Sequence, residues 1–587
     1  MFRPILALSA SLFLAHTASA TSPTVSLDYG VFQGAVDGNL STFLGVPFAQ
    51  PACCHDSVRF SLPQPPTLLH GVQNATAFGP ACPQQALSPV PLPVAVPHEG
   101  VVSEDCLKLN VFAPRAISPH SKLPVFVWIY GGTSNRLRAV TGFWVLIDVL
   151  GGFEIGNAPD TEVRPLVERS ISIGEPVIIV TPNYRLNALG FLAGKEVGDA
   201  GITNLGLRDQ IFALEWCQKH IAAFGGDPAR VVIGGPSAGA ISASLLLLNN
   251  KQFEPTALFR GAFMLSGSPI TTGSVADGQP HYDELVLANN CTGSNDTLEC
   301  LKRVPLHSFM ATVNHTPNIF SFSSLQNIWR PRVDGDVVVH NPLVSVSKGL
   351  YARVPLMTGD ADDEGTLFSL SNTNITTDEE FVGYVHSNYL PRSTPAQIAQ
   401  IATLYPDDPT QGSPFGTGLA NQFTPQFKRL AAFQGDYLFV GTRRFFLEHA
   451  SKTQNTWSWC AKRGKSTPIF GASHGSDVGI WFPAANSTDF APADALSEWA
   501  SLWPVLTLTR KHPVNFINTL DPNHSSSTKT NASQTVFWPK WNTPTSDGSP
   551  SLLTLSDPGV INVTSENFRA DAIQFLHGLL LQEAVSG

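Results

Sequence analysis

A serine placed between two glycines is the residue of this sequence best suited to act as a nucleophile. In Gly235-x-Ser237-x-Gly239 the serine follows the apolar run Val231–Ile233 and precedes a stretch of small residues and leucines that starts at Ala240. This context of strand, tight turn and helix predicts a nucleophile elbow, in which the hydroxyl stands clear of the backbone above a helix N-terminus. Such a serine could attack an electrophilic carbon and form a covalent intermediate.

A second match to the same pattern is centred on Ser473, and its context differs. The residues after Gly475 give no helical continuation, so we interpret Ser473 as a loop residue that precedes a useful histidine, His474. A serine nucleophile needs a base to take its proton and an acid to orient that base, and on α/β sheets of this type they follow in the order serine, acid, histidine. His474 fits the base in this order.

The candidates for the acid lie together in one acidic turn. The turn follows Met357-Thr358-Gly359, which is typical of the end of a buried strand, and open α/β sheets place their chemistry at the carboxyl ends of strands. The residues alone do not choose among its four carboxylates, which are Asp360, Asp362, Asp363 and Glu364.

The elements that must position these groups are buried strands separated by helices. Apolar runs at Leu123–Tyr130, Pro176–Val180 and Val231–Ile233 predict strands, and Leu205–Phe224 predicts a helix that ends at Gly225-Gly226. Strands that are apolar on both faces belong to a mainly parallel sheet with helices on both sides. The sequence therefore predicts an α/β fold, with one domain over residues 21–587.

The composition describes a globular protein that is unsuited to nucleic acid. Charged residues make up 14% of the 587 residues, hydrophobic residues make up 43%, and the net charge is −10. No stretch beyond the N-terminus is apolar for long enough to span a bilayer. The spacing of Cys and His residues predicts no metal site, and no cofactor is expected.

Residues 1–20 have the three parts of a secretory signal peptide, which are a positive charge at Arg3, an apolar core at Ile5–Ala15 and the cleavage site Ala18-Ser19-Ala20. Secretion allows N-linked glycans. The acceptor sequons are at Asn39, Asn74, Asn290, Asn295, Asn314, Asn374, Asn486, Asn523, Asn531 and Asn562.

Cysteines in an oxidising compartment are expected to be partly paired. Cys291 and Cys300 lie close together in a polar loop and predict a local disulfide, while Cys82 and Cys106 flank a proline-rich loop that they could close. Cys217 falls in the predicted helix and is expected to be a buried thiol. The pairing of the remaining cysteines stays open, namely Cys53, Cys54 and Cys460.

Six further stretches spread over the chain are specific enough to compare with the motifs of known families. They are Phe43–Ala49, Ser103–Val111, Asn183–Leu186, Asn204–Gln210, Phe224–Pro228 and Leu265–Pro269. With the elbow, they resemble the type-B carboxylesterase/lipase family, which includes cholinesterases and secreted fungal lipases. The resemblance implies the α/β-hydrolase fold, with Ser237 as nucleophile, Glu364 as acid and His474 as base. It also implies two disulfides and two ion pairs, which are Cys82–Cys106, Cys291–Cys300, Arg59–Glu104 and Arg185–Asp209.

The sequence departs from the family pattern directly before the nucleophile. The family commonly has glutamate there, whereas this chain has Pro236. Proline has a fixed φ and no N–H, and the change removes a buried carboxylate that could support charge in the active site. We therefore expect a different rate or substrate preference.

A larger departure interrupts the loop that should bind the oxyanion. The family has Gly-Gly-Gly-Phe, but here the 19 residues Thr133 to Gly151 separate Gly131-Gly132 from Gly152-Phe153. The second half of this insert is strongly apolar, which is unusual for a loop. Our hypothesis is that the insert is translated intron sequence, and a genuine lid or substrate-binding insertion is the alternative. The residues expected to form the oxyanion hole are Gly131, Gly132, Gly152 and Ala238.

The resulting interpretation is a secreted serine hydrolase that cleaves small-molecule or lipid carboxylic esters through an acyl-enzyme. Two alternatives stay open. One is an esterase-like binding protein with impaired catalysis, because this fold also serves such roles. The other is a triacylglycerol lipase. The sequence assigns neither the acyl and alcohol parts of the ester nor the oligomeric state.

Overall fold

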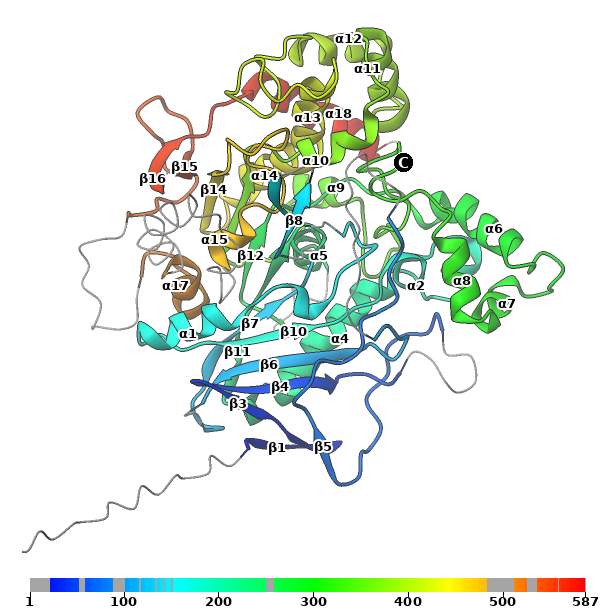
Figure 1. The fold of residues 1–587 in the computed structure, drawn as a ribbon, viewed down its shortest axis with the longest axis vertical. Coiled ribbons are helices and arrows are strands. Elements are labelled where there is room, and N and C mark those ends of the chain that lie inside the picture. The colour runs from blue at the N-terminus through cyan, green and yellow to red at the C-terminus, as the bar shows by residue number, and fades with distance from the viewer. Residues whose placement is uncertain are drawn as a thin grey trace, which may run out of the picture.

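The computed structural model describes residues 22–51, 59–87, 101–115, 118–131, 151–249, 258–482, 511–524, 536–557 and 559–585, and the backbone of strands at 135–140 and 143–148. The predicted signal peptide, Cys53, Cys54 and Gly132 lie outside these residues. An eleven-stranded sheet crosses the described chain in the order β16-β15-β14-β13-β12-β11-β7-β10-β6-β4-β3 (Figure 1). Its strands are β3 (Ala35–Asp37), β4 (Leu40–Pro47), β6 (Lys108–Pro114), β7 (Leu123–Trp128), β10 (Ile178–Pro182), β11 (Gly226–Pro236), β12 (Gly261–Leu265), β13 (Leu356–Ala361), β14 (Thr456–Lys462), β15 (Ser551–Ser556) and β16 (Val560–Ser565).

The middle of the sheet is parallel and its edges are antiparallel. β10, β7, β11, β12, β13, β14 and β15 pair in parallel, whereas β16 at one edge and β6, β4 and β3 at the other pair antiparallel. The predicted apolar runs form β7, β10 and β11, so the prediction of a mainly parallel sheet is confirmed.

Helices cover both faces of the sheet, as predicted, and two hydrophobic cores result. One core contains the buried sides of α4 (Leu205–His220) and α5 (Ala238–Leu247), and the other contains those of α1 (Arg164–Ser172) and α17 (Lys511–Thr519). α6, α7 and α8 project to one side of the sheet in Figure 1. The other main helices are α6 (Gln279–Ala288), α7 (Thr297–Arg303), α8 (Leu306–Val313), α9 (Pro342–Ser347), α10 (Thr366–Ser369), α11 (Asp378–Tyr384), α12 (Pro395–Leu404), α13 (Phe427–Gly435), α14 (Gly441–Ala450) and α18 (Ala570–Val585).

The predicted helix at 205–224 begins where expected but divides before its end. α4 stops at His220, a 3₁₀ turn covers Ile221–Phe224, and Gly225 follows with a φ of 82°. Glycine suits this left-handed position because it has no Cβ. The turn returns the chain to β11, which carries the serine at its carboxyl end.

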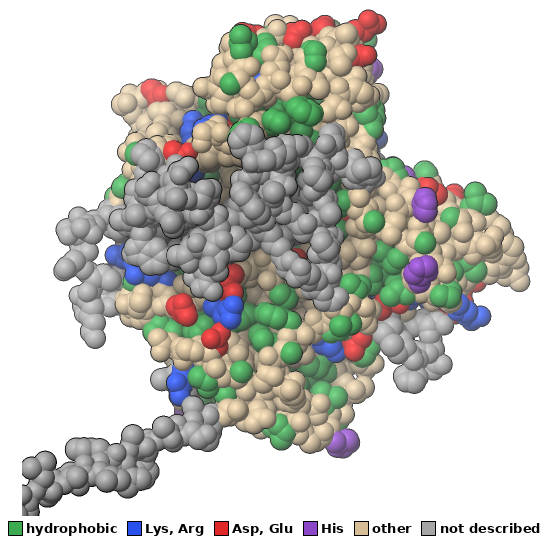
Figure 2. Space-filling model, viewed as in Figure 1, with side chains coloured by type: hydrophobic (Ala, Val, Ile, Leu, Met, Phe, Trp, Pro, Cys, Tyr) green, Lys and Arg blue, Asp and Glu red, His purple; other side chains and the backbone are tan. Residues whose placement is uncertain are grey.

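The described surface fits the acidic composition. On the face seen in Figure 2, Lys and Arg side chains stand in small separate groups among acidic ones. Within the described ranges, no helix is long and apolar enough to cross a membrane.

The predicted disulfides and ion pairs are confirmed. Cys82 bonds to Cys106, and Cys291 bonds to Cys300. Cys217 is a buried free thiol as expected, and so is Cys460. The predicted ion pairs join Arg59 to Glu104 at 2.7 Å and Arg185 to Asp209 at 2.7 Å.

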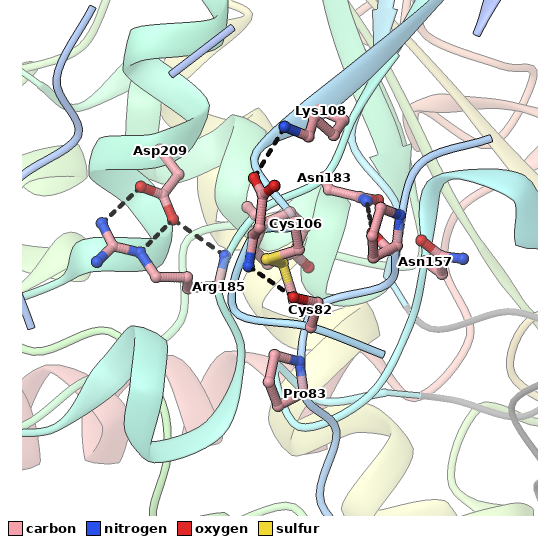
Figure 3. Close-up of a disulfide and its surroundings, with 12 residues drawn as sticks. Cys82, Pro83, Cys106, Lys108, Asn157, Asn183, Arg185 and Asp209 are labelled. Carbon is pink, nitrogen blue, oxygen red and sulfur yellow. Dashed lines mark hydrogen bonds and ion pairs between the residues drawn. A yellow bond between two sulfur atoms is a disulfide. The ribbon is translucent and has the colours of Figure 1, made fainter. Parts of the chain in front are cut away.

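The Arg185–Asp209 pair lies close to the Cys82–Cys106 disulfide (Figure 3). Both Asp209 carboxylate oxygens bond to the guanidinium, at 2.8 and 2.7 Å, and one of them also accepts the Arg185 backbone N–H at 3.0 Å. The two side chains expose at most 4% of their surface. The pair therefore fixes the segment after β10 to the start of α4.

Replacement of Asp209 by alanine is expected to destabilise the protein by about 3–5 kcal/mol, because it leaves a buried guanidinium without its counter-charge. Chemical denaturation of the purified variant measures this loss. The matched control is Asp199→Ala, which removes the exposed Lys195–Asp199 pair and should leave the unfolding midpoint unchanged. Equal midpoints for the Asp209→Ala variant and the unmodified protein would show that the pair has no stabilising role.

Candidate active site

Ser237 occupies the sharp turn between β11 and α5. Its backbone has φ 52° and ψ −122°, a conformation that residues with a Cβ rarely adopt. Gly235 and Gly239 allow this turn, because a Cβ at either position would lie 1.8 or 2.0 Å from the carbonyl oxygen of Ile129. The elbow therefore requires glycines on both sides of the serine, as the sequence predicted.

The strands beside β11 surround the serine closely. A Cβ added to Gly131, which follows β7, would lie 3.0 Å from the Ser237 Cβ and 2.0 Å from the Pro236 carbonyl oxygen. On the other side, the Ser237 N–H donates to the Leu265 carbonyl at 2.8 Å. Pro236 is the last residue of β11 and pairs with Leu265, so the proline is accommodated at the end of the strand.

Three of the four carboxylates in the acidic turn are engaged by cations away from the histidine. Asp360 pairs with Arg443 at 2.5 Å, and the Lys465 ammonium contacts Asp362 at 2.5 Å and Asp363 at 2.6 Å. All three carboxylates are buried. These ion pairs explain the abundance of acidic residues in the turn without a role in catalysis.

The fourth carboxylate, Glu364, contacts Nδ1 of His474. Its other oxygen accepts hydrogen bonds from the Ser266 hydroxyl at 2.7 Å and from the Ala361 N–H at 2.6 Å. Burial raises the pKa of Glu364, and these two donors oppose that shift because they stabilise the carboxylate. Glu364 is thus held in one position, with one oxygen directed at the imidazole.

His474 lies in the loop after β14, next to the acidic turn. A bridge between Asp363 and Ser473 brings the loop and the turn together. The imidazole is buried against the rings of Phe439 and Phe368, whose centroids lie 4.4 and 5.2 Å from its own. Burial lowers the pKa of His474, so the ring is neutral at pH 7 and can accept a proton.

The second nitrogen of this ring is free to act. Nε2 of His474 is buried and has no hydrogen-bond partner among the described residues. A neutral imidazole whose Nδ1 is held by a carboxylate can accept a proton at Nε2 from a nearby hydroxyl. In this structure Nε2 forms no hydrogen bond with the Ser237 hydroxyl, and it is left as an unoccupied proton acceptor.

Several residues around the site were not predicted from the sequence. Ser266, which bonds to Glu364, directly follows β12, and its place at the carboxyl end of a central strand could have identified it. Asp477 is buried beside the pair, accepts a hydrogen bond from Trp459 at 3.1 Å, and has its pKa raised by burial to about 7. Phe439 gave no sequence signal, because only the fold brings it to His474.

The described part of the insert contains a pair of strands, and its last residue lies beside Gly131. Its strands β8 (Asn135–Val140) and β9 (Phe143–Asp148) pair antiparallel in a separate two-stranded sheet. At the base, the Gly151 N–H donates to the Gly131 carbonyl at 3.0 Å. The last residue of the insert therefore lies next to Gly131.

The residues predicted for the oxyanion hole are only partly brought together. Gly131 lies close to Ser237, since an added Cβ would come within 3.0 Å of the Ser237 Cβ. Ala238 is the first residue of α5, where an N–H has no partner within the helix. Gly152 follows the hairpin with a φ of 49° and is packed against Ile319. Its carbonyl accepts a hydrogen bond from Asn327. Within the described ranges, no group of three His, Cys, Asp or Glu side chains could hold a metal ion.

Known proteins resemble this chain over nearly its whole length. The profile of the carboxylesterase family matches residues 21–571. Secreted lipase 1 of Botryotinia fuckeliana is 34% identical over 95% of this chain and 93% of its own length. Secreted triacylglycerol lipase LIP1 of Gibberella zeae is 33% identical over 95% of this chain and 90% of its own length. The crystal structure of Aspergillus niger EstA superposes with a TM-score of 0.78 at 26% identity, over 96% of this chain and 99% of that one.

Proposed function

Because this chain belongs to the carboxylesterase family and is a carboxylic ester hydrolase, we propose that it acts through an acyl-enzyme on Ser237. The serine hydroxyl attacks the ester carbonyl carbon while Nε2 of His474 takes its proton. When the tetrahedral intermediate collapses, His474 returns this proton to the leaving alcohol. A water molecule, activated by the same imidazole, then hydrolyses the acyl-enzyme and releases the acid. Glu364 keeps the imidazole oriented and stabilises its charged form.

The contact between Glu364 and Nδ1 of His474 is the observation that carries this proposal. It selects one acid from the four in the turn, and it leaves Nε2 without a partner on a buried, neutral ring. A structural histidine in a core commonly has both nitrogens hydrogen-bonded or one exposed to water. The strained turn at Ser237 supports the same assignment, because such strain is often found at functional sites.

A triacylglycerol is the second candidate substrate. Its support comes from the relatives, one of which is named a triacylglycerol lipase and another a secreted lipase. These names and the signal-peptide pattern also support our proposal that the protein is secreted. Hydrolysis of an emulsified triacylglycerol, compared with a soluble short-chain ester, distinguishes a lipase from an esterase.

We also propose N-linked glycans at exposed sequons. The exposed sequon asparagines are the candidates, namely Asn39, Asn74, Asn290, Asn295, Asn314, Asn374 and Asn562. Asn523 is a poor one, because its amide donates to the Trp538 carbonyl at 2.8 Å and accepts the Trp538 N–H at 2.7 Å.

A fluorophosphonate probe tests the proposed mechanism, because it reacts with activated serines. We expect one adduct per folded chain, located by peptide mass spectrometry at Ser237, and parallel loss of p-nitrophenyl butyrate hydrolysis. Heat-unfolded protein is the control and should not be labelled. An adduct at Ser473, or ester hydrolysis that survives complete labelling, would contradict the assignment. A binding protein with impaired catalysis would show neither labelling nor hydrolysis.

A further inference from the structure

A cavity of about 780 Å³ lies apart from the proposed catalytic residues. It is bounded by the segment after β12, by residues 326–344, and by the C-terminal end of α18 (Figure 1). Its volume is typical of sites that bind small organic molecules. None of the residues proposed for catalysis lines it.

Two arginines without counter-ions line this cavity, and they are the half-buried Arg330 and the buried Arg332. Arg330 has no hydrogen-bond or ion-pair partner among the described residues, and its Nε is buried. Arg332 is only 7% exposed, donates one N–H to the Ile328 carbonyl at 3.2 Å, and has an Nε that is buried and unpartnered. Burial lowers the pKa of both guanidinium groups, and Arg330 adds to the lowering at Arg332.

The acidic groups of the cavity do not neutralise these two cations. Asp277 attracts both arginines, but its carboxylate accepts hydrogen bonds from the Ser274 N–H at 2.6 Å and hydroxyl at 3.1 Å rather than from either guanidinium. The cavity is lined by more cations than carboxylates. The cations are Arg330, Arg332, Lys348 and Arg392, and the carboxylates are Asp277 and Glu583. A buried charge without a partner costs free energy, so an anion in the cavity would be stabilised.

We propose that this cavity binds an organic carboxylate, whose oxygens accept hydrogen bonds from Arg330 and Arg332. Guanidinium groups match the planar, two-oxygen geometry of a carboxylate. The valines of the wall, Val339, Val344 and Val585, provide apolar contact for an aliphatic part. The ligand class is then an amphiphilic acid such as a fatty acid. The choice of this class rests on the proposed function, because such acids are products of ester hydrolysis.

The cavity and the active site share structural elements. Gln326 donates to the Tyr437 hydroxyl at 2.9 Å, and both residues line the cavity. The next residue after Gln326, Asn327, donates to the carbonyl of Gly152, and Phe439, two residues after Tyr437, packs on His474. A bound acid would therefore contact the same segments that hold the loop and the imidazole.

Calorimetric titration with sodium octanoate tests the proposal. Labelling of the protein with the fluorophosphonate beforehand blocks the serine site, and its mass spectrum shows independently whether the proposed mechanism holds. Where labelling fails, the Ser237→Ala protein is titrated instead. We expect one octanoate per chain and at least about tenfold weaker binding of the neutral octanamide, since hydrogen bonds to charged groups contribute that much or more.

Variants at the cavity extend the test. Arg330→Leu should weaken octanoate binding about tenfold or more, Arg330→Lys should weaken it less, and the exposed-surface control Arg303→Leu should leave it unchanged. Absence of binding, or equal affinity for octanoate and octanamide, would overturn the proposal even if Arg330→Leu fails to fold. Equal octanoate affinity in folded Arg330→Leu and unmodified protein would also overturn it.

Discussion

The Ser237→Ala variant is expected to lose nearly all hydrolysis of a short p-nitrophenyl ester, with kcat lowered by about 10⁴- to 10⁶-fold. Alanine at the elbow keeps the backbone turn but removes the only atom proposed to bond to the acyl group. Initial rates over a range of ester concentrations measure the effect. KM should change much less than kcat, because the substitution removes bond formation rather than substrate contacts.

Ser473→Ala is the matched control, because Ser473 lies in the second Gly-x-Ser-x-Gly match of the chain. A four-residue helix, α15 (Val478–Trp481), does begin five residues after Ser473, contrary to the sequence prediction. Ser473 still lies in a loop with a single bridge to Asp363 and not at the end of a strand, so we expect near-normal turnover from this variant. Unchanged turnover in Ser237→Ala would refute Ser237 as nucleophile. If Ser473→Ala lost most of its turnover while Ser237→Ala kept normal turnover, Ser473 would be assigned as the nucleophile instead.

Deletion of Thr133 to Gly151 is expected to raise kcat/KM for the same ester by about 10²- to 10³-fold. The deletion joins Gly132 directly to Gly152 and restores the unbroken glycine run of the family's oxyanion loop. One correctly aimed oxyanion donor is worth a rate factor of about this size. Gly151, the last residue of the insert, is already hydrogen-bonded to Gly131 at the end of β7, so the deletion should require little movement of the sheet.

A shorter deletion provides the control for this experiment. Removal of residues 137–146 shortens both strands of the hairpin but leaves the glycine run interrupted, so kcat/KM should stay low. Thermal melting of both variants checks that each folds. If the full deletion is no more active than the complete chain, the insert is a tolerated part of the enzyme. Full-length transcripts that uniformly encode Thr133 to Gly151 would likewise reject an intron origin.

The central strands and the elbow could be predicted from the sequence because their signals are local. Apolar runs gave β7, β10 and β11, and two glycines around one serine gave the turn. The choice of Glu364 over its three acidic neighbours could not come from local sequence. It depends on Arg443 and Lys465, which reach the turn from distant segments and pair with the other carboxylates.

The unpaired arginines of the cavity were also beyond sequence reasoning. In the sequence, Arg330 and Arg332 lie within four residues of Asp334, a spacing that suggests ion pairs between these arginines and the aspartate. In the fold, Asp334 instead accepts hydrogen bonds from Thr203 and Asn204, at 2.7 Å each. Whether a charge is partnered depends on which segments pack around it, and only the tertiary structure determines that.

The closed base of the hairpin matters for how a cell would treat this protein. A loop that departs and returns at one point adds little to the free energy of folding, since each doubling of loop length costs only about 0.6 kcal/mol. A chain with the insert should therefore fold almost as well as one without it. Secretory quality control recognises misfolding and does not test activity. If two transcripts exist, both products would be exported, and their splicing ratio would set the active fraction of the secreted enzyme.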